Sequence, residues 1–327
     1  MKKRGIGVGC MYYGLGYGFS RQDISSVTIE MCEDGSVILR SGEVDCGQGS
    51  DTILCQIVAE ELGIPYQEIQ LIAADTLTTP NAGPTSASRV TYVTGMAALR
   101  AARALKKSLQ SVAEEALGET DLLFEENSVR SASRPEKKIS FKELARRCHL
   151  SGRPIVETVW HDNTTQDVDK ETGQGDAYSA YSYAAQLAEV EVDTETGQVE
   201  VLRIVAAHDV GKAINPGNVE AQIEGGVVMG MGYALEEKIE LGQGLLQTES
   251  LGEYMIPTFK DVPDIIPHII EVPVARGPYG AKGVGEPALI PTAPAILNAI
   301  ANALDIRITE TPANLENVLR LIRKKEG

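Results

Sequence analysis

The eleven residues from Gly277 to Pro287 constrain the fold most, because four glycines and two prolines surround the single carboxylate of Glu286. Glycine allows positive φ angles and a close approach of backbone to a ligand, and Pro287 biases Glu286 toward an extended conformation. An apolar, helix-like stretch at residues 295–304 follows this loop. An acid in such a position is a candidate general base, although an exposed loop glutamate beside a turn would show the same pattern.

The segment Gly47–Gly49, with Gln48 at its centre, follows a strand-like stretch and precedes a helix-like one. We expect Ser50 or Asp51 to cap that helix and Gly63 to end it. Amide groups at a helix N-terminus attract anions, and glycine lets a ligand reach them. The segment is therefore a candidate ligand site. The alternative is an ordinary loop glutamine before a helix.

A threonine-rich loop at residues 76–88 ends in Ser86, Ala87 and Ser88, and a long helical pattern runs from about residue 89 to 117. Small side chains at that helix start leave room for a bulky anionic group, and the hydroxyls add hydrogen bonds. Simple capping by serine accounts for the same residues. The pattern alone allows both interpretations.

A second helix-like pattern, at residues 215–236, begins near a proline and contains several glycines. Each interior glycine costs roughly 1 kcal/mol relative to alanine, which favours a very close packing contact against this segment. We expect Met229 and Met231 to lie in the core. His208, at the end of the preceding apolar stretch, is either a ligand or a hydrogen-bonded structural histidine.

Alternating apolar residues predict two hairpins, at residues 27–39 and 188–206. The glycine-rich residues 5–18 predict an irregular strand close to other backbone, since too few residues precede them for a dinucleotide-binding loop. The pattern indicates an α+β protein without a βαβ rhythm or an internal repeat. The other expected elements are a peripheral subdomain at 121–150 with a helix at 141–147, a sheet-like segment at 245–256 and a final helix at 315–322.

The chain has 46 acidic and 30 basic side chains, and its net charge of −16 disfavours general nucleic-acid binding. Its five cysteines include no Cys-x-x-Cys pair, so we expect no iron–sulfur or structural zinc site in this chain. Met1–Arg4 leads into glycines rather than into an apolar signal core, and we expect no apolar run of membrane-spanning length. A cytoplasmic protein without membrane contact is expected.

Four segments resemble, in order and separation, those of the molybdopterin-binding part of the xanthine dehydrogenase (molybdenum hydroxylase) family: residues 47–49, 83–89, 209–225 and 277–287. The resemblance runs from about residue 4 to 321 and covers only the C-terminal part of a molybdenum-binding subunit. In this respect the chain is similar to the medium molybdopterin subunit of nicotinate dehydrogenase, a naturally split subunit. The resemblance implies a molybdopterin-binding fold with mixed sheets, hairpins and long helices, in subdomains at residues 1–180 and 181–327.

The resemblance also implies roles for individual residues. It assigns Glu286 as the catalytic general base and places Tyr13 and Tyr17 in the substrate pocket. It assigns no metal ligand to the protein, because dithiolene sulfurs of the pterin hold molybdenum. The implied cofactor contacts are Gly47, Gln48, Gly49, Ser86, Ala87, Ser88, Thr91, Gln222, Lys282, Gly283, Val284 and Gly285.

By resemblance, the chain is the molybdopterin-binding subunit of an oxidoreductase that hydroxylates an N-heteroaromatic substrate, such as nicotinate or a purine, with oxygen from water. The expected cofactor is molybdenum-molybdopterin in the cytosine dinucleotide form. The expected partners are a large molybdopterin subunit, an iron–sulfur subunit with two-iron two-sulfur clusters, and an FAD subunit. The alternatives are the same chemistry on xanthine, aldehydes or aromatic thioesters, and a non-catalytic cofactor-carrying, assembly or structural subunit.

Overall fold

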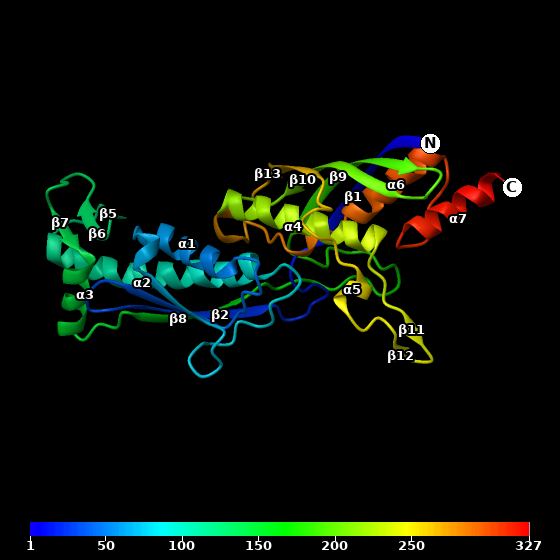
Figure 1. Cartoon of the computed structure of the whole chain (residues 1–327). Helices are drawn as coiled ribbons and strands as arrows, with labels where there is room; N and C mark the ends of the chain where they lie inside the picture. Colours follow the sequence, from blue (N-terminus) through cyan, green and yellow to red (C-terminus); the bar gives the residue numbers. More distant parts are fainter. Residues whose placement is uncertain (327) are drawn as a thin grey trace. The chain divides into compact units, whose positions relative to one another are not determined.

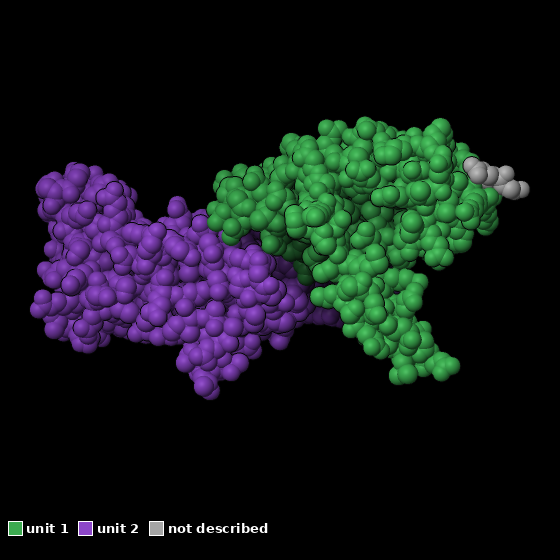
Figure 2. All heavy atoms as spheres, in the orientation of Figure 1, with its two compact units in different colours: residues 1–13, 181–272, 284–327 green, residues 14–180, 273–283 purple. Residues whose placement is uncertain are grey.

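The computed structural model describes residues 1–326, and the chain divides into two compact units (Figure 1, Figure 2). Unit 1 comprises residues 1–13, 181–272 and the chain from 284 onward, and unit 2 comprises residues 14–180 and 273–283. The sequence of one unit is therefore interleaved with that of the other.

Unit 2 is built on a mixed sheet of four strands in the order β4-β3-β2-β8. The predicted first hairpin is confirmed, since β2 and β3 pair antiparallel and β3 alternates buried and half-buried residues. Strand β8 pairs antiparallel with the other edge of β2. The strands are β2 (Ile24–Met31), β3 (Val37–Ser41), β4 (Ile69–Ala73) and β8 (Val156–Asp162).

Strand β4 pairs parallel with β3, and helix α1 (Ser50–Leu62) connects them. This is a βαβ unit, so the expectation of no βαβ rhythm is wrong. A parallel pair requires such a crossover. The sequence pattern predicts a short strand at residues 69–73, which is β4, but it does not indicate that this strand pairs parallel with β3.

Helix α2 (Gly95–Leu117) is the long helix predicted after the second loop, and it packs on β2 and β8 beside α1 (Figure 1). The turn that leads into it, Val90–Thr94, is a π-helix. The strands and the helix predicted at residues 121–150 are confirmed as a small sheet and helix α3 (Phe141–Leu150), which Ser140 caps, but their buried side chains join the core of unit 2 and form no separate subdomain. The strands of that sheet are β5 (Leu122–Glu125), β6 (Ser128–Ser131) and β7 (Lys138–Ser140).

Unit 1 is built on a second mixed sheet, in the order β1-β9-β10-β13. Strands β9 and β10 form the second predicted hairpin, and β13 pairs parallel with β10. Helices α4 (Pro216–Leu235) and α6 (Thr292–Leu304) enclose the core against this sheet, and α7 (Leu315–Glu326) follows. The strands are β1 (Lys2–Gly14), β9 (Tyr181–Asp193), β10 (Val199–Asp209) and β13 (Asp264–Ile270).

Strand β1 is the glycine-rich strand expected to pass close to other backbone, and that backbone is α6. A Cβ atom on Gly5 would lie 2.1 Å from the carbonyl oxygen of Ala299, and one on Gly7 would lie 2.1 Å from the Ala299 nitrogen. Only glycine lets the helix lie directly on the strand. The asparagines of α6 also bind the strand, because Asn302 Oδ1 accepts from Ile6 N at 3.0 Å.

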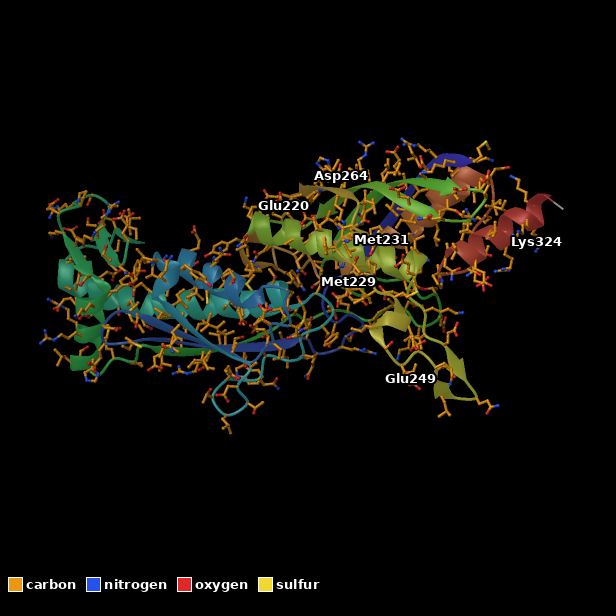
Figure 3. The ribbon with its side chains drawn as sticks, in the orientation of Figure 1. Glu220, Met229, Met231, Glu249, Asp264 and Lys324 are labelled. Atoms are coloured by element: carbon orange, nitrogen blue, oxygen red, sulfur yellow. The ribbon has the colours of Figure 1, made fainter. Side chains whose placement is uncertain are left out.

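One of the two methionines expected in the core is exposed. Met231 is buried in the core of unit 1, whereas Met229 is 61% exposed (Figure 3). Residues two apart on an α-helix lie on nearly opposite sides, so both could not face the same core.

The sheet-like segment expected at residues 245–256 is mostly not a sheet. It contains β12 (Leu245–Leu246), which pairs only with the two-residue β11 (Leu241–Gly242), and then the single helical turn α5 (Leu251–Tyr254). Ser250 and Glu253 form a capping box at that turn, which accounts for the helical geometry.

The stretch Glu286–Leu304 is long and apolar enough to cross a membrane by length and composition, contrary to the expectation from sequence. Its helical part, α6, supplies Ile296, Ala299 and Ile300, all fully buried, to the core of unit 1. The apolar character of a single such stretch is explained by this core position.

Candidate functional site

The predicted anion site at the start of α1 already holds a carboxylate, that of Asp45. Its oxygens accept hydrogen bonds from the backbone nitrogens of Gly47 (2.8 Å), Gly49 (3.2 Å) and Asp51 (3.2 Å). The N-cap is Gly49, in the left-handed conformation, so the predicted caps Ser50 and Asp51 are wrong, whereas Gly63 ends the helix as expected. Although burial raises the pKa of Asp45, these backbone hydrogen bonds together hold it below its ordinary value.

The side chain of Gln48 is also engaged within its own loop. Its Oε1 accepts from the backbone nitrogen (2.7 Å) and the Sγ (3.1 Å) of Cys46. Its Nε2 donates to the carbonyl oxygen of Val44 (3.0 Å) and to Ser50 Oγ (2.9 Å). Gln48 therefore fixes the loop, and it reaches a ligand only if some of these bonds open.

Two further acids lie at this loop, and both carry buried oxygens. Glu43 is 1% exposed and accepts a hydrogen bond from Ser41 Oγ. Burial raises the pKa of Glu43 to about 7, and the neighbouring acids Asp51 and Asp45 add to this rise. Within the described part of the chain, Glu43 Oε1 and Asp51 Oδ1 have no hydrogen-bond partner. Glu43 is thus protonated at neutral pH more readily than an ordinary glutamate.

The second predicted loop places two successive non-glycine residues in the left-handed region, Ala87 (φ 52°) and Ser88 (φ 50°). Such residues are strained and occur where the surrounding structure fixes them, often at functional sites. Gly16 N donates to the Ala87 carbonyl oxygen at 2.9 Å, and the Tyr17 hydroxyl bonds Ser86 Oγ at 2.7 Å. The loop thus meets the segment of Tyr17.

A buried ion pair holds this loop in place. Arg89, fully buried, donates from Nε to Asp23 Oδ1 at 2.5 Å, and Asp23 Oδ2 accepts from Tyr17 N at 2.9 Å. The guanidinium also donates to the carbonyl oxygens of Ala82 (2.8 Å), Pro84 (3.0 Å) and Ile24 (2.7 Å). Sequence reasoning missed Asp23 and the role of Arg89. The available signal was an arginine at the start of an apolar helical pattern.

The first part of the Gly277–Pro287 loop contacts the Ser86–Ser88 loop within unit 2. A Cβ atom on Gly283 would lie 1.8 Å from the carbonyl oxygen of Ser88, so the two backbones touch. Lys282, beside it, is 5% exposed, and Thr91 is half-buried in the π-helical turn. Unit 2 therefore brings together Tyr17, the residues 86–88 and Gly283.

Glu286 belongs to unit 1, where it begins the single 3₁₀ turn Glu286–Ala288 and is half-buried. The turn packs directly on α4. A Cβ atom on Gly226 would lie 2.5 Å from Ala288 Cβ, and one on Gly230 would lie 2.5 Å from Thr292 Cβ. The close packing predicted from the glycines of α4 is confirmed, and its partner is this turn and the start of α6.

A buried polar network supports the turn from behind. Gln186 Nε2 donates to the Ala288 carbonyl oxygen at 2.8 Å and contacts His208 Nε2 at 3.0 Å, while Thr292 Oγ1 donates to Gln186 Oε1 at 2.7 Å. An amide nitrogen only donates, so His208 Nε2 accepts and Nδ1 carries the proton. Burial lowers the pKa of His208 to about 4, which keeps the ring neutral. His208 is the hydrogen-bonded structural histidine of the two alternatives.

The remaining predicted site residues lie in unit 1. Gln222 is half-buried on α4, four residues before Gly226, so it lies on the helix face that meets the Glu286 turn. Val284 packs against the core of unit 1, Gly285 is exposed, and Tyr13 lies half-buried near the end of β1. Among residues 1–326, no group of three or more His, Cys, Asp or Glu side chains is placed to hold a metal ion.

Comparison with known proteins identifies relatives of this chain. The family model described as "Molybdopterin cofactor-binding domain" matches residues 1–263. The chain is 30% identical over 316 residues to the "Xanthine dehydrogenase molybdenum-binding subunit" of Escherichia coli O157:H7, covering 95% of this chain and 41% of that protein. It is 31% identical over 301 residues to the "Nicotine 6-hydroxylase large subunit" of Paenarthrobacter nicotinovorans, covering 90% of this chain and 36% of that one.

Among solved structures, the aldehyde oxidoreductase from Desulfovibrio desulfuricans is similar with a TM-score of 0.82 and 33% identity, covering 98% of this chain and 32% of that chain. The chain thus spans less than half the length of each of these three proteins.

Proposed function

This chain belongs to the xanthine dehydrogenase (molybdenum hydroxylase) family, and we propose that it takes part in hydroxylating an N-heteroaromatic substrate such as nicotinate or a purine. The family and fold predicted from the four loops are thereby confirmed, and the relatives are molybdenum oxidoreductases. Support for the substrate class comes from two relatives, since xanthine and nicotine both contain nitrogen heteroaromatic rings.

The residues of unit 2 fit a molybdopterin cofactor unevenly. The loop of Ser86–Ser88 and Thr91 offers hydroxyl groups beside a rigid backbone that Arg89 holds, and this suits the polar pterin and its phosphate. The Gly47–Gly49 loop offers fewer groups, because Asp45 and Gln48 already use its amides and its side-chain donors. We therefore assign the first cofactor contacts to Ser86, Ser88 and Thr91.

The position of Glu286 is the observation that carries the proposal. When bound, the molybdenum cofactor supplies the two-electron redox chemistry, and the protein supplies positioning and proton transfer. A general base must stand at a fixed distance from the proton that it takes. The contact of Ala288 with Gly226 and the hydrogen bond from Gln186 fix the turn that carries Glu286. In this proposal the carboxylate of Glu286 accepts the proton that the water-derived oxygen loses during hydroxylation.

The proposal includes partners and a cofactor form. The chain covers 41% of a relative that is a xanthine dehydrogenase subunit, so the rest of the molybdenum site is assigned to a large molybdopterin subunit. We assign electron transfer to two-iron two-sulfur clusters and FAD on further subunits. We also propose that the pterin cofactor is the cytosine dinucleotide form.

The second candidate is a subunit that carries or assembles the cofactor without turnover, and the substrate alternatives are xanthine, aldehydes and aromatic thioesters. A carrier would need the loop at residues 86–88 but no fixed carboxylate. The support that Gln186 and Gly226 give to the Glu286 turn therefore favours the catalytic role.

The test is a Glu286→Gln variant of the complex with its partner subunits, compared with Glu220→Gln on the exposed surface of α4 (Figure 3). Turnover of nicotinate, purines and aldehydes is measured together with molybdenum and acid-released CMP. We expect Glu286→Gln to lower turnover by about 10²–10⁴-fold with molybdenum retained, because a general base contributes that much. Unchanged turnover in the Glu286→Gln variant would show that Glu286 is not the general base. A wild-type complex that assembles without molybdenum would favour the structural or assembly role.

A further inference from the structure

Residues 239–262 of unit 1, here called the apolar arm, concentrate exposed hydrophobic side chains. Figure 1 and Figure 2 show β11, β12 and α5 standing out from the rest of unit 1. Nine large apolar side chains in this segment are each at least 40% exposed: Ile239, Leu241, Leu245, Leu246, Leu251, Met255, Ile256, Phe259 and Val262. Clustered exposure of this kind marks interaction surfaces, whereas single exposed apolar residues are normal.

The arm is an ordered element. Glu240 N donates to Thr248 Oγ1 at 2.9 Å, and Gln247 N donates to the Glu240 carbonyl oxygen at 2.8 Å. Thr258 donates from both its nitrogen and its Oγ1 to Asp261 Oδ2, each at 2.7 Å. Polar groups thus fix the backbone of the arm, while its apolar side chains are exposed to solvent. In an ordinary surface loop, polar side chains would be exposed instead.

The arm is also joined firmly to the helix that supports Glu286. A Cβ atom on Gly232 of α4 would lie 2.7 Å from Pro257 Cδ, so the arm returns to the helix at close range. The same helix meets the Glu286 turn at Gly226. A protein bound on the arm would therefore contact an element that is one helix away from the proposed base.

The charge of the arm favours a partner other than a second copy. Four acids, Glu240, Glu249, Glu253 and Asp261, stand against the single base Lys260 between residues 239 and 262. The whole chain carries a net charge of −16. Like charges brought together oppose association, and complementary charges favour it. The surface that receives the arm should therefore be apolar at its centre and basic at its rim.

We propose that the apolar arm docks into an apolar, basic-rimmed groove of the separate large molybdopterin subunit, which supplies the part of the relatives that this chain does not span. This inference rests on the proposed function for the existence of that partner. Phe259, 85% exposed, is the aromatic anchor, with Leu245 and Leu246 at the tip of the hairpin. Few residues, mostly large, carry the binding energy of such interfaces.

The first experiment uses the chain of the same genome that matches the unspanned part of the relatives, co-expressed with this chain. A variant with Leu245→Ser, Leu246→Ser and Phe259→Ser is compared with a control that carries Leu77→Ser and Leu150→Ser, two exposed leucines of unit 2. We expect the arm variant to raise the Kd of the complex by about 100-fold or more, and the control to leave it unchanged. Equal Kd values in the two variants would overturn the proposal.

The second experiment is hydrogen–deuterium exchange of the wild-type chain alone and in the complex, together with its mass by light scattering. We expect the amides of residues 239–262 that carry no hydrogen bond in the chain alone to gain protection in the complex. No gain of protection in the arm when the complex forms, or a homodimer that the arm substitutions dissolve, would overturn the proposal. A complex that assembles through the arm but lacks molybdenum would leave the docking intact and contradict the proposed function.

Discussion

A Cβ atom placed on Gly226 would lie 2.5 Å from the Cβ of Ala288, so α4 and the turn that begins at Glu286 are in direct contact. A Cβ atom on Gly225, its neighbour, would have no atom within 4 Å apart from its chain neighbours and the backbone of its own helix. Glycine in a helix costs roughly 1 kcal/mol relative to alanine. Glycine is required at position 226 despite this cost, because a side chain there would displace the turn. No contact requires glycine at position 225.

These two glycines give a matched pair of variants. We expect Gly225→Ala to stabilise the protein by about 0.5–1 kcal/mol through helix propensity. We expect Gly226→Ala to destabilise it by about 1–3 kcal/mol because the methyl group meets Ala288, and to lower turnover because the Glu286 turn moves. Urea unfolding and turnover measure both effects. Similar unfolding midpoints for the two variants would contradict the packing account.

Gln186 is expected to contribute more to stability than its partner Thr292. A Gln186→Met variant leaves the Ala288 carbonyl oxygen and His208 Nε2 buried without their donor, so we expect a loss of about 2–4 kcal/mol. Thr292→Val removes a single hydrogen bond and should cost about 1 kcal/mol. Urea unfolding of both variants tests the order, which an equal loss would contradict.

Asp45 is expected to stabilise the start of α1. Asp45→Asn replaces the charged acceptor of three backbone amides by a neutral one, and we expect a loss of about 1–2 kcal/mol. The exposed Asp176→Asn is the control. Hydrogen exchange of the first turn of α1 should accelerate in the Asp45 variant only. An unchanged exchange rate would show that the amides are held by something other than this carboxylate.

Glu43 should make stability fall as pH rises. Burial raises its pKa from 4.5 to about 7, so between these values the native state holds a proton that the unfolded chain has released. The free energy of unfolding therefore decreases across this window, by about 3 kcal/mol in total. Glu43→Gln removes the dependence, so the variant should exceed the wild type at pH 8 and converge with it near pH 4. Parallel curves of unfolding midpoint against pH would refute this.

Local patterns in the sequence predicted most of the elements. Alternation located the two hairpins, and the long helical period located α2. The alternating glycines of β1 predicted a close backbone contact but could not identify α6, which lies almost 300 residues away. The βαβ unit was missed because a local pattern locates a strand such as β4 without indicating which strand it pairs with or in which direction.

The site was predictable in its loops but not in its internal bonds. The sequence analysis singled out the Ser86–Ser88 loop and the Glu286 turn for their site residues, and the structure shows a strained backbone in the first and close packing on α4 in the second. The Asp23–Arg89 ion pair joins residues far apart in sequence, and no local pattern indicates it. Asp45 was missed because it lies before the helix that it caps, and in the sequence such an acid cannot be distinguished from any other acidic loop residue. The roles of the individual residues in binding and catalysis stay predictions.

The interleaving of the two units fixes the order in which they are completed during synthesis. Strand β1 emerges before β9, its neighbour in the sheet, which begins only at Tyr181, roughly 10–30 s later at typical rates of translation. By then residues 14–180, most of unit 2, are already made. Helix α6, which covers the glycines of β1, and the turn of Glu286 come in the last part of the chain. A polypeptide released early would therefore carry the Ser86–Ser88 loop without the proposed base.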